Sequence, residues 1–404
     1  MKYDFSTLMD RRGWDAMAVE APGSSDWAPG GPKEGFDVIP MWVADMNFPT
    51  VPTVPKALME RAAHPAYGYF DTRREYYDAI LRWQTRRNGA KGLEQRHIGY
   101  ENGVLGGLLS ALRVLCSPGE RVLVHAPTYI GFTHSVGNAG YKLVYTPLRR
   151  DQDGVWRMDY ADMEKKLREQ AIHAAILCSP HNPCGRVWER GELEEAMALF
   201  RKYNVFVISD EIWSDILRPG YTHIPTQSVT EDARDRTVAL YAPSKTFNLA
   251  GLVGAYHIIY NDWLRDRVVR ESSLCHYNEM NLLSMYALIG AYGPEGEKWL
   301  SELNTVLAGN VDYALAYMRG HFHGVEAARP QGTYMLFTDC GGWLDSHGLS
   351  LKELERRLWD VGVTVQDGAM FGGKSHVRMN LALPLSRVQE AFDRMDRYVF
   401  NREG

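Results

Sequence analysis

The feature that most constrains the fold is an alternation of short apolar runs with longer amphipathic stretches, which begins near Val51. The apolar runs are Arg121–Ala126, Leu143–Pro147, Ala174–Cys178, Val205–Ser209, Val238–Tyr241 and Ala255–Tyr260. Between them, Gly191–Tyr203 places its large apolar residues on one helical face, namely Leu193, Ala196, Met197 and Phe200. Such strand–helix alternation predicts an α/β fold with a mostly parallel sheet and helices on both of its faces.

The C-terminal third has a different pattern. A long helical segment is predicted from about Asn281 to Gly320, followed by a mixture of strands (Thr333–Asp339, Val377–Leu383) and helices (Ser350–Val361, Ser386–Tyr398). We therefore expect a large domain over 51–290 and a smaller α+β domain over 291–404. Residues 1–50, which hold several glycines and prolines, are expected to form an arm that joins the small domain.

Composition and charge narrow the class of protein. The 404 residues are 45% hydrophobic and 24% charged, an ordinary globular mixture that excludes disordered and collagen-like chains. The net charge of −5 provides no basic excess for nucleic acid. The five cysteines form no CxxC pair, which is typical of reduced thiols in the cytoplasm. The N-terminus resembles no signal peptide, and the longest uncharged stretch, Leu282–Gly293, is too short to cross a membrane.

Polar residues collect directly after the predicted strands, the edge at which open α/β sheets bind ligands. They are Tyr129, Asn182, Asp210 and Lys245. Each alone also fits a structural role, such as a turn, a helix cap or a solvated charge. Together, an amine, a carboxylate and an aromatic ring suit pyridoxal phosphate (PLP), because the amine can form a Schiff base while the carboxylate keeps the pyridine nitrogen protonated. Gly103–Gly107 opens a helical run whose N-terminal amides suit a phosphate.

Three segments carry a family resemblance. Ser244–Gly251, Ser209–Ile212 and Asn182–Arg186 resemble the fold-type I PLP enzymes of aminotransferase class I/II. Within that class, Trp42–Pro49 resembles the MalY/PatB branch, known for cystathionine β-lyase and related C–S lyase activity. The resemblance covers nearly the whole chain and implies a large domain with a mostly parallel, seven-stranded sheet.

The resemblance also implies roles for single residues. Lys245 corresponds to the Schiff-base lysine, Asp210 to the partner of the pyridine nitrogen, and Asn182 to the donor to the ring 3′-oxygen. Tyr129 would stack on the ring and is nearest by motif for assisting the leaving group. The backbone amides of Gly103, Val104 and Leu105, with help from Ser244, would hold the phosphate. Tyr69 matches a tyrosine that reaches the phosphate of a neighbouring subunit, which implies a homodimer with shared active sites. Arg378 would grip the substrate α-carboxylate in a bidentate fork, and the backbone of Ala44 would close that end.

Three positions depart from the family pattern, and one of them is Asn47, where the motif usually has Asp. Family members usually carry His or Tyr after Asp-Glu-Ile, whereas this chain has Trp213, which we place among the cofactor-binding residues. An indole donates a hydrogen bond but does not exchange protons. Many aminotransferases carry an arginine where this chain has Val253, a departure that favours the lyase branch.

Two other motifs suggest rival chemistry. Gly368–Ser375 satisfies the P-loop pattern GxxxxGK[ST], but a P-loop must lead directly into a helix, and the residues after Ser375 are predicted to form a strand. His321 and His323 lack acidic or cysteine partners at ligand spacing, so we expect no metal site.

The sequence therefore predicts a PLP-dependent C–S β-lyase that cleaves L-cystathionine or a related cysteine S-conjugate to a thiol, pyruvate and ammonia. The alternative is a PLP-dependent aminotransferase of an L-amino acid, because both reactions use the same frame of residues.

Overall fold

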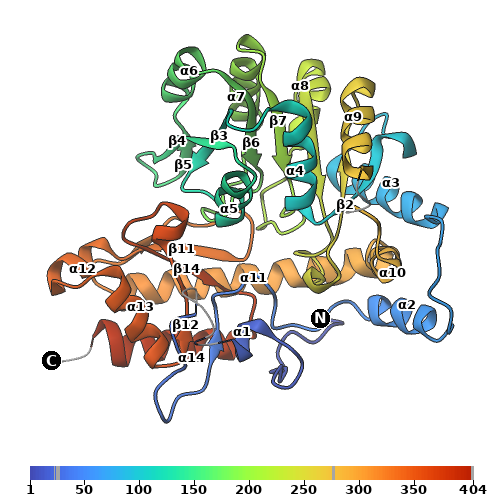
Figure 1. Cartoon of the computed structure of the whole chain (residues 1–404). Coiled ribbons are helices and arrows are strands. Elements are labelled where there is room, and N and C mark those ends of the chain that lie inside the picture. The colour runs from blue at the N-terminus through green and yellow to red at the C-terminus, as the bar shows by residue number, and fades with distance from the viewer. Residues whose placement is uncertain (22, 24–27, 275–277, 402–404) are drawn as a thin grey trace. The chain divides into compact units, whose positions relative to one another are not determined.

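The apolar runs of the sequence form the strands of one large sheet in the computed structural model, which describes residues 1–21, 23, 28–274 and 278–401 (Figure 1). The chain divides into two units, each described by itself below. The larger unit comprises Thr50–Asn182 and Arg186–Ser301. The smaller unit comprises the described residues of Met1–Pro49, Pro183–Gly185 and the segment that begins at Glu302.

The sheet of the larger unit has eight strands among the described residues, one more than the seven expected. In spatial order they are β2 (Ile98–Asn102), β9 (Gly254–Ile258), β8 (Thr237–Tyr241), β7 (Phe206–Asp210), β6 (Ile172–Cys178), β3 (Arg121–Ala126), β4 (Lys142–Arg150) and β5 (Trp156–Met158). The central five strands, from β8 to β4, are parallel, whereas β9 and β5 run antiparallel to their neighbours. The fold class predicted from the sequence is confirmed. Strands β2 and β5 lie outside the apolar runs.

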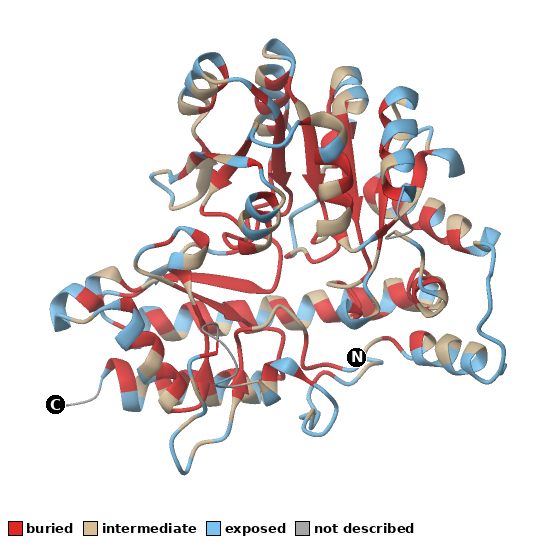
Figure 2. Ribbon diagram, in the orientation of Figure 1, coloured by how far each residue is buried: buried red, intermediate tan, exposed pale blue. Residues whose placement is uncertain are grey.

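Helices cover both faces of this sheet (Figure 1). On one face, α4 (Val104–Leu115) contacts α5 (Ile130–Asn138) and α9 (Asp262–Ser273). On the other, α7 (Arg190–Lys202) contacts α6 (Tyr160–Glu169) and α8 (Glu231–Arg236). The buried residues of α7 are the four that the sequence placed on one face: Leu193, Ala196, Met197 and Phe200. The central strands β6, β7 and β8 are almost continuously buried, as parallel strands between two helical layers must be (Figure 2).

The long helix predicted from Asn281 to Gly320 is two helices, α10 (Leu282–Ala291) and α11 (Pro294–His321). The break falls at Tyr292–Gly293 because proline disfavours a helical conformation in the residue before it and is well suited to the first position of a new helix. Helix α10 packs against α2 (Thr53–Ala62), where the Thr53 hydroxyl donates to the Gly290 carbonyl at 2.6 Å. Helix α3 (Arg74–Asn88) also contacts α10.

The smaller unit is α+β. Its sheet has the order β10 (Glu326–Ala327), β11 (Met335–Asp339), β14 (His376–Asn380) and β13 (Gln366–Asp367), all antiparallel. A separate pair joins β1 (Ile39–Pro40) of the N-terminal segment to β12 (Val363–Thr364). Its helices are α1 (Met17–Glu20), the later turns of α11, α12 (Gly341–His347), α13 (Leu351–Asp360) and α14 (Leu385–Met395). Apolar side chains from α11, β11, α13, β14 and α14 form one core.

Two expectations from the sequence, about the cysteines and about membrane-spanning helices, concern both units. The four cysteines that the structure describes are buried free thiols; Cys275 lies outside the described residues. Among the described residues, no helix is long and apolar enough to cross a membrane.

Candidate active site

The parallel register of the larger unit brings the predicted site segments to one edge of the sheet. Strands β3, β6, β7 and β8 are mutually parallel, so the segments that follow them leave the sheet at the same edge. Asp210 is the last residue of β7, and the segments that follow the other three strands carry Tyr129, Asn182 and Lys245. Strand β2 pairs antiparallel with β9, which pairs antiparallel with β8. The end of β2, followed by Gly103, therefore lies at that edge too.

Asp210 is the last residue of β7 and is 4% exposed. Its Oδ1 accepts a hydrogen bond from the backbone N–H of Ile212 at 3.1 Å. Burial raises the pKa of the Asp210 carboxyl to about 7, although that hydrogen bond and the positive charge of Lys245 act in the opposite direction. A carboxyl group with such a pKa can hold or share a proton near neutral pH.

Lys245 follows β8, and its ammonium group lies over the indole ring of Trp213, with 5.9 Å between Nζ and the ring centroid. Trp213 is buried, whereas Lys245 and the neighbouring Ser244 are half-buried. The Lys245 amine thus lies against an aromatic ring and close enough to a buried carboxyl to interact with it. This position suits covalent and proton-transfer chemistry.

Helix α4 begins directly after Gly103. The first N–H groups of a helix have no partner within the helix, so those of its first turn, which include Val104 and Leu105, suit an anion. The position of this helix is set by Gly107, where a Cβ would lie 2.7 Å from Leu240 Cδ2 and 2.8 Å from Glu101 Cγ. Only glycine permits such a close approach of α4 to strands β2 and β8.

Tyr129 caps the start of α5, and its ring lies against the backbone of that helix. A Cβ at Gly131 would lie 2.7 Å from Cζ of the Tyr129 ring, so the ring occupies the space that any other residue at position 131 would fill. Phe132 contacts the ring edge-on, with 5.4 Å between the centroids. The ring is therefore fixed from two sides.

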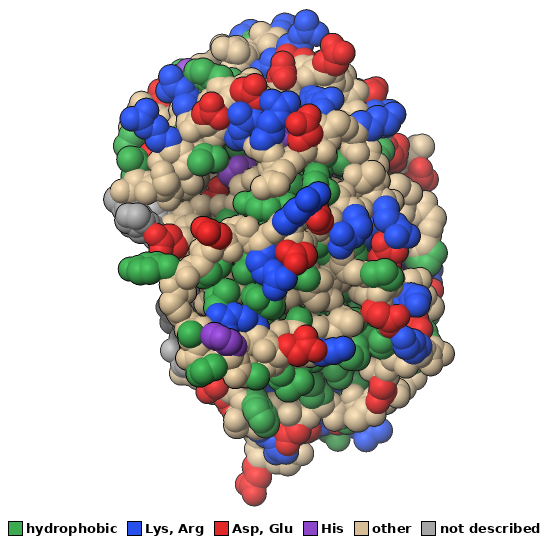
Figure 3. Space-filling model, turned by 90° about the vertical axis from the view of Figure 1, so that its right-hand side faces the viewer, with side chains coloured by type: hydrophobic (Ala, Val, Ile, Leu, Met, Phe, Trp, Pro, Cys, Tyr) green, Lys and Arg blue, Asp and Glu red, His purple; other side chains and the backbone are tan. Residues whose placement is uncertain are grey.

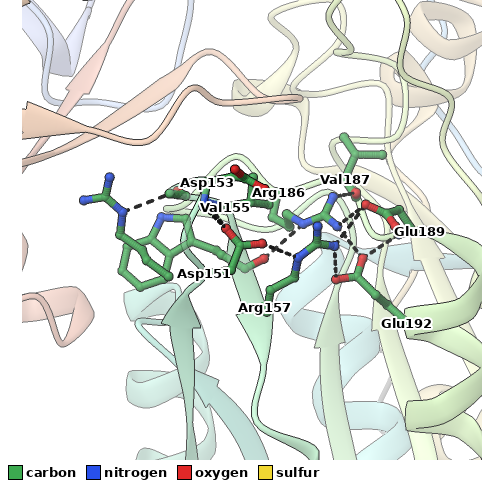
Figure 4. Close-up of polar contacts among 11 residues, drawn as sticks. Asp151, Asp153, Val155, Arg157, Arg186, Val187, Glu189 and Glu192 are labelled. Carbon is green, nitrogen blue, oxygen red and sulfur yellow. Dashed lines mark hydrogen bonds and ion pairs between the residues drawn. The ribbon is translucent and has the colours of Figure 1, made fainter.

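Asn182 is buried in a turn that Arg186 holds in place. The His181 N–H donates to the Arg186 carbonyl at 2.8 Å, which closes the turn. The Arg186 guanidinium is buried and forms ion pairs with Glu189 and Glu192, and its Nε donates to the Trp156 carbonyl (Figure 4). Arg157 pairs with the same two glutamates and with Asp151 (Figure 4). This network anchors the Asn182 turn to α7 and to the β4–β5 hairpin.

Sequence reasoning missed a second layer of buried polar residues behind the strand ends. Glu211, next to Asp210, is fully buried and accepts hydrogen bonds from Ser209 Oγ, the Thr226 N–H, His223 Nε2 and Tyr241 OH. Asp215, two residues after Trp213, accepts from Thr246 Oγ1, adjacent to Lys245. The one available signal was a repeated acidic residue in Asp210-Glu211-Ile212-Trp213-Ser214-Asp215, whose partners are distant in sequence.

Tyr69 is not part of this group within one copy of the chain. It lies in the irregular segment between α2 and α3, and its side chain is fully exposed. Tyr67 and Phe70 of the same segment are also exposed.

In the smaller unit, Arg378 and Ala44 belong to one connected arrangement. Arg378 lies on β14, is buried, and donates through Nη2 to Gln366 Oε1 and to the Trp42 carbonyl, the latter at 3.2 Å. Its guanidinium covers the ring of Phe371 at 4.4 Å. The Ala44 carbonyl accepts from Tyr334 OH at 3.0 Å. The N-terminal segment is thus fixed to the strand that carries the arginine.

The P-loop pattern does not have P-loop geometry. Gly368–Phe371 form a short 3-10 helix, and Ser375 leads into strand β14, as the sequence predicted. Among the described residues, no group of side chains that could hold a metal ion includes His321 or His323. His321 pairs with Asp396 at 3.0 Å and stacks on Tyr317.

Comparisons with known proteins agree with this architecture. The family model for aminotransferase class I and II matches residues 37–395, so the chain belongs to that family. Cystathionine beta-lyase PatB of Bacillus subtilis is 34% identical over 364 residues, which cover 89% of this chain and 92% of PatB. Protein MalY of Escherichia coli is 30% identical over 400 residues, covering 96% of each chain. The crystal structure of the PLP-bound C-S lyase from Staphylococcus hominis superimposes with a TM-score of 0.88 at 29% identity, covering 98% of each chain.

Proposed function

We propose that this protein is a PLP-dependent C–S β-lyase that cleaves L-cystathionine or a related cysteine S-conjugate to a thiol, pyruvate and ammonia. The observation that carries the proposal is the group at the sheet edge: Lys245 against the Trp213 ring and in electrostatic contact with buried Asp210. Relatives named as cystathionine β-lyases, aligned over most of the chain, support the choice of reaction.

The cofactor is pyridoxal 5′-phosphate, and the residues of the larger unit fit it. Their donor set contains an amine for its aldehyde, a buried carboxyl for its ring nitrogen and the free amides of a helix start for its phosphate. Asn182 would donate to the ring oxygen, Tyr129 and Trp213 would contact the ring, and Ser244 would contribute to the phosphate site. When bound, the cofactor supplies an electron sink for negative charge that develops at the substrate α-carbon.

The remaining steps are assigned to residues of this chain. Lys245 Nζ would remove the proton from the substrate α-carbon. Asp210, buried at the strand end, keeps a proton on the pyridine nitrogen. Because a thiol has a pKa of about 8.5, the sulfur leaves as a thiolate with little acid assistance, and Tyr129 is the candidate for what assistance is needed. We assign the grip on the substrate α-carboxylate to Arg378 and the closing backbone contact to Ala44.

We also propose that the protein works as a cytoplasmic homodimer with shared active sites. The exposed aromatic residues Tyr67, Tyr69 and Phe70, with exposed Met59 on α2, give the larger unit an apolar surface that a second copy could cover. Figure 3 shows hydrophobic side chains mixed with charged ones on the face that carries this region. Tyr69 from the second copy would then reach the cofactor phosphate. The buried free thiols support a reducing compartment.

The alternative reaction is transamination, which the family as a whole favours because its model is that of the aminotransferases. In that reaction Lys245 would return the proton to the cofactor, and the sulfur substituent would stay on the substrate.

The test is release of pyruvate and ammonia from L-cystathionine by the purified PLP-loaded enzyme with no keto acid present. Sustained release over many turnovers establishes the lyase. Conversion of the cofactor to its pyridoxamine form, reversed by a keto acid, would instead establish the aminotransferase. The Lys245→Ala variant should lose either activity, and turnover at the parent rate in that variant would refute the site assignment.

A further inference from the structure

Asp215 is a buried carboxylate at which three segments of the larger unit meet. It is 3% exposed and follows Trp213 by two residues. Its Oδ2 accepts from Thr246 Oγ1 at 3.0 Å, and Arg87 Nε donates to its Oδ1 at 2.8 Å. Trp83 Nε1 donates to the same carboxylate at 3.2 Å. The segment after β7, the segment after β8 and helix α3 are therefore joined through one side chain.

Burying a charge in this way is costly unless partners compensate it. Arg87 supplies the opposite charge, and its guanidinium also covers the Trp83 ring at 5.1 Å. Trp83 in turn stacks on Tyr292, with 4.5 Å between the ring centroids. Asp215 thus lies on a rigid aromatic support rather than at a solvated surface.

The contact with Thr246 matters most, because Thr246 is the residue next to Lys245. A β-branched side chain has few rotamers, so one hydrogen bond at Thr246 Oγ1 also fixes the direction of the backbone there. Lysine has a long, flexible side chain, whose reach is limited by the position of its Cα. An anchor at residue 246 therefore decides where Lys245 Nζ can lie.

We propose that Asp215 is a positioning residue, which holds the Lys245 segment against the Trp213 segment so that Nζ stays over the indole and near Asp210. The proposal deepens the function given above and rests on it. Asp215 itself need not touch substrate or cofactor.

The experiment uses two variants at Thr246, because they leave the charge of Asp215 paired with Arg87. Thr246→Val keeps the shape but removes the hydroxyl, and Thr246→Ser keeps the hydroxyl. In PLP-loaded protein we measure the pH midpoint of the visible cofactor absorbance and the rate of cofactor loss after dilution. Thr246→Val should move the midpoint and speed cofactor loss roughly tenfold, as expected for one lost hydrogen bond to a charged group. Thr246→Ser should restore both values.

A purely structural role would lower stability without moving the absorbance. Asp215→Asn tests the carboxylate directly and should behave like Thr246→Val, whereas Arg87→Gln should lower the melting temperature with the absorbance midpoint unchanged. If Thr246→Val has the same absorbance midpoint and the same rate of cofactor loss as the parent protein, the proposal is wrong. Failure of the parent protein to bind PLP through Lys245, assayed by borohydride trapping and peptide mapping, would overturn the proposed function and this inference with it.

Discussion

Lys245 Nζ lies 5.9 Å from the centroid of the Trp213 ring, so the amine of the candidate site faces an indole at the position where the family pattern has His or Tyr. The indole stabilises a positive charge over its face, by about 0.5–2 kcal/mol in proteins. It cannot exchange a proton in the physiological pH range. The Trp213 ring therefore stabilises the charged form of Lys245, but it adds no titratable group to the site.

Replacement of Trp213 by histidine should add such a titration. We expect the pH profile of kcat/KM for Trp213→His to gain a limb near pH 6.5, the ordinary pKa of histidine, because the imidazole changes charge there. Trp213→Phe, which keeps an aromatic face, is the control and should lack that limb. Identical profiles for the two variants would show that the group at position 213 does not sense the reacting atoms.

The raised pKa of Asp210 predicts a pH-dependent stability of the cofactor-free protein. Its pKa is about 7 in the folded chain against 3.8 for an unperturbed aspartate, so the folded state binds the extra proton. The associated stability is complete below about pH 4 and is lost as the pH rises through 7, with a difference on the order of 4 kcal/mol. Asp210→Asn should remove this dependence and be the more stable protein at pH 8. Chemical denaturation at pH 5 and pH 8 measures it; parallel pH dependences in parent and variant would contradict the assignment.

Gly131→Ala should displace the Tyr129 ring. The new methyl would overlap the ring, and overpacking of this kind typically costs about 1–3 kcal/mol. We expect lower stability together with an altered cofactor absorbance, because Tyr129 is the proposed stacking residue. Gly137→Ala in the same helix is the matched control: nothing lies within 4 Å of its Cβ, so that variant should be slightly more stable, with an unchanged spectrum. Equal spectra in both variants would argue against stacking by Tyr129.

A mixing experiment tests the shared active site. Tyr69→Phe and Lys245→Ala homodimers should each have low activity. After the two are unfolded and refolded together in equal amounts, half of the dimers are hybrids, and one of the two sites in each hybrid carries neither substitution. Activity should then recover to roughly a quarter of the parent value, the statistical share for a twofold dimer. No recovery, with hybrids demonstrated by mass, would show that Tyr69 serves its own subunit or neither.

The sequence was informative wherever a pattern is local. The four buried apolar residues of α7 were predictable from helical periodicity. The strands at whose ends Tyr129, Asn182 and Asp210 lie were predictable from short apolar runs. The motif segments identified the family, which the family model confirms. The break between α10 and α11 was missed because large apolar residues return at Trp299 and Leu300, as they would in one continuous helix, although Gly293 and the proline after it mark the break.

What could not be predicted depends on residues that are distant in sequence. Asp215 gains its importance from Trp83, Arg87 and Thr246, and Glu211 from His223 and Tyr241. No spacing rule connects these positions, because they come together only in the folded chain. The roles of Arg378 and Tyr69 stay predictions, since each depends on a contact with another part of the assembly.

The close approach at Gly107 has a consequence for how the cofactor is held. Helix α4, whose first amides suit the phosphate, is pressed against Leu240 on the strand that leads to Lys245. Between the Gly107 backbone of α4 and the Leu240 side chain of β8 there is thus no room for one more carbon atom. A side chain at position 107 would push α4 away from Leu240 and Glu101, and with it would move the phosphate end of the proposed site away from the strand that leads to Lys245.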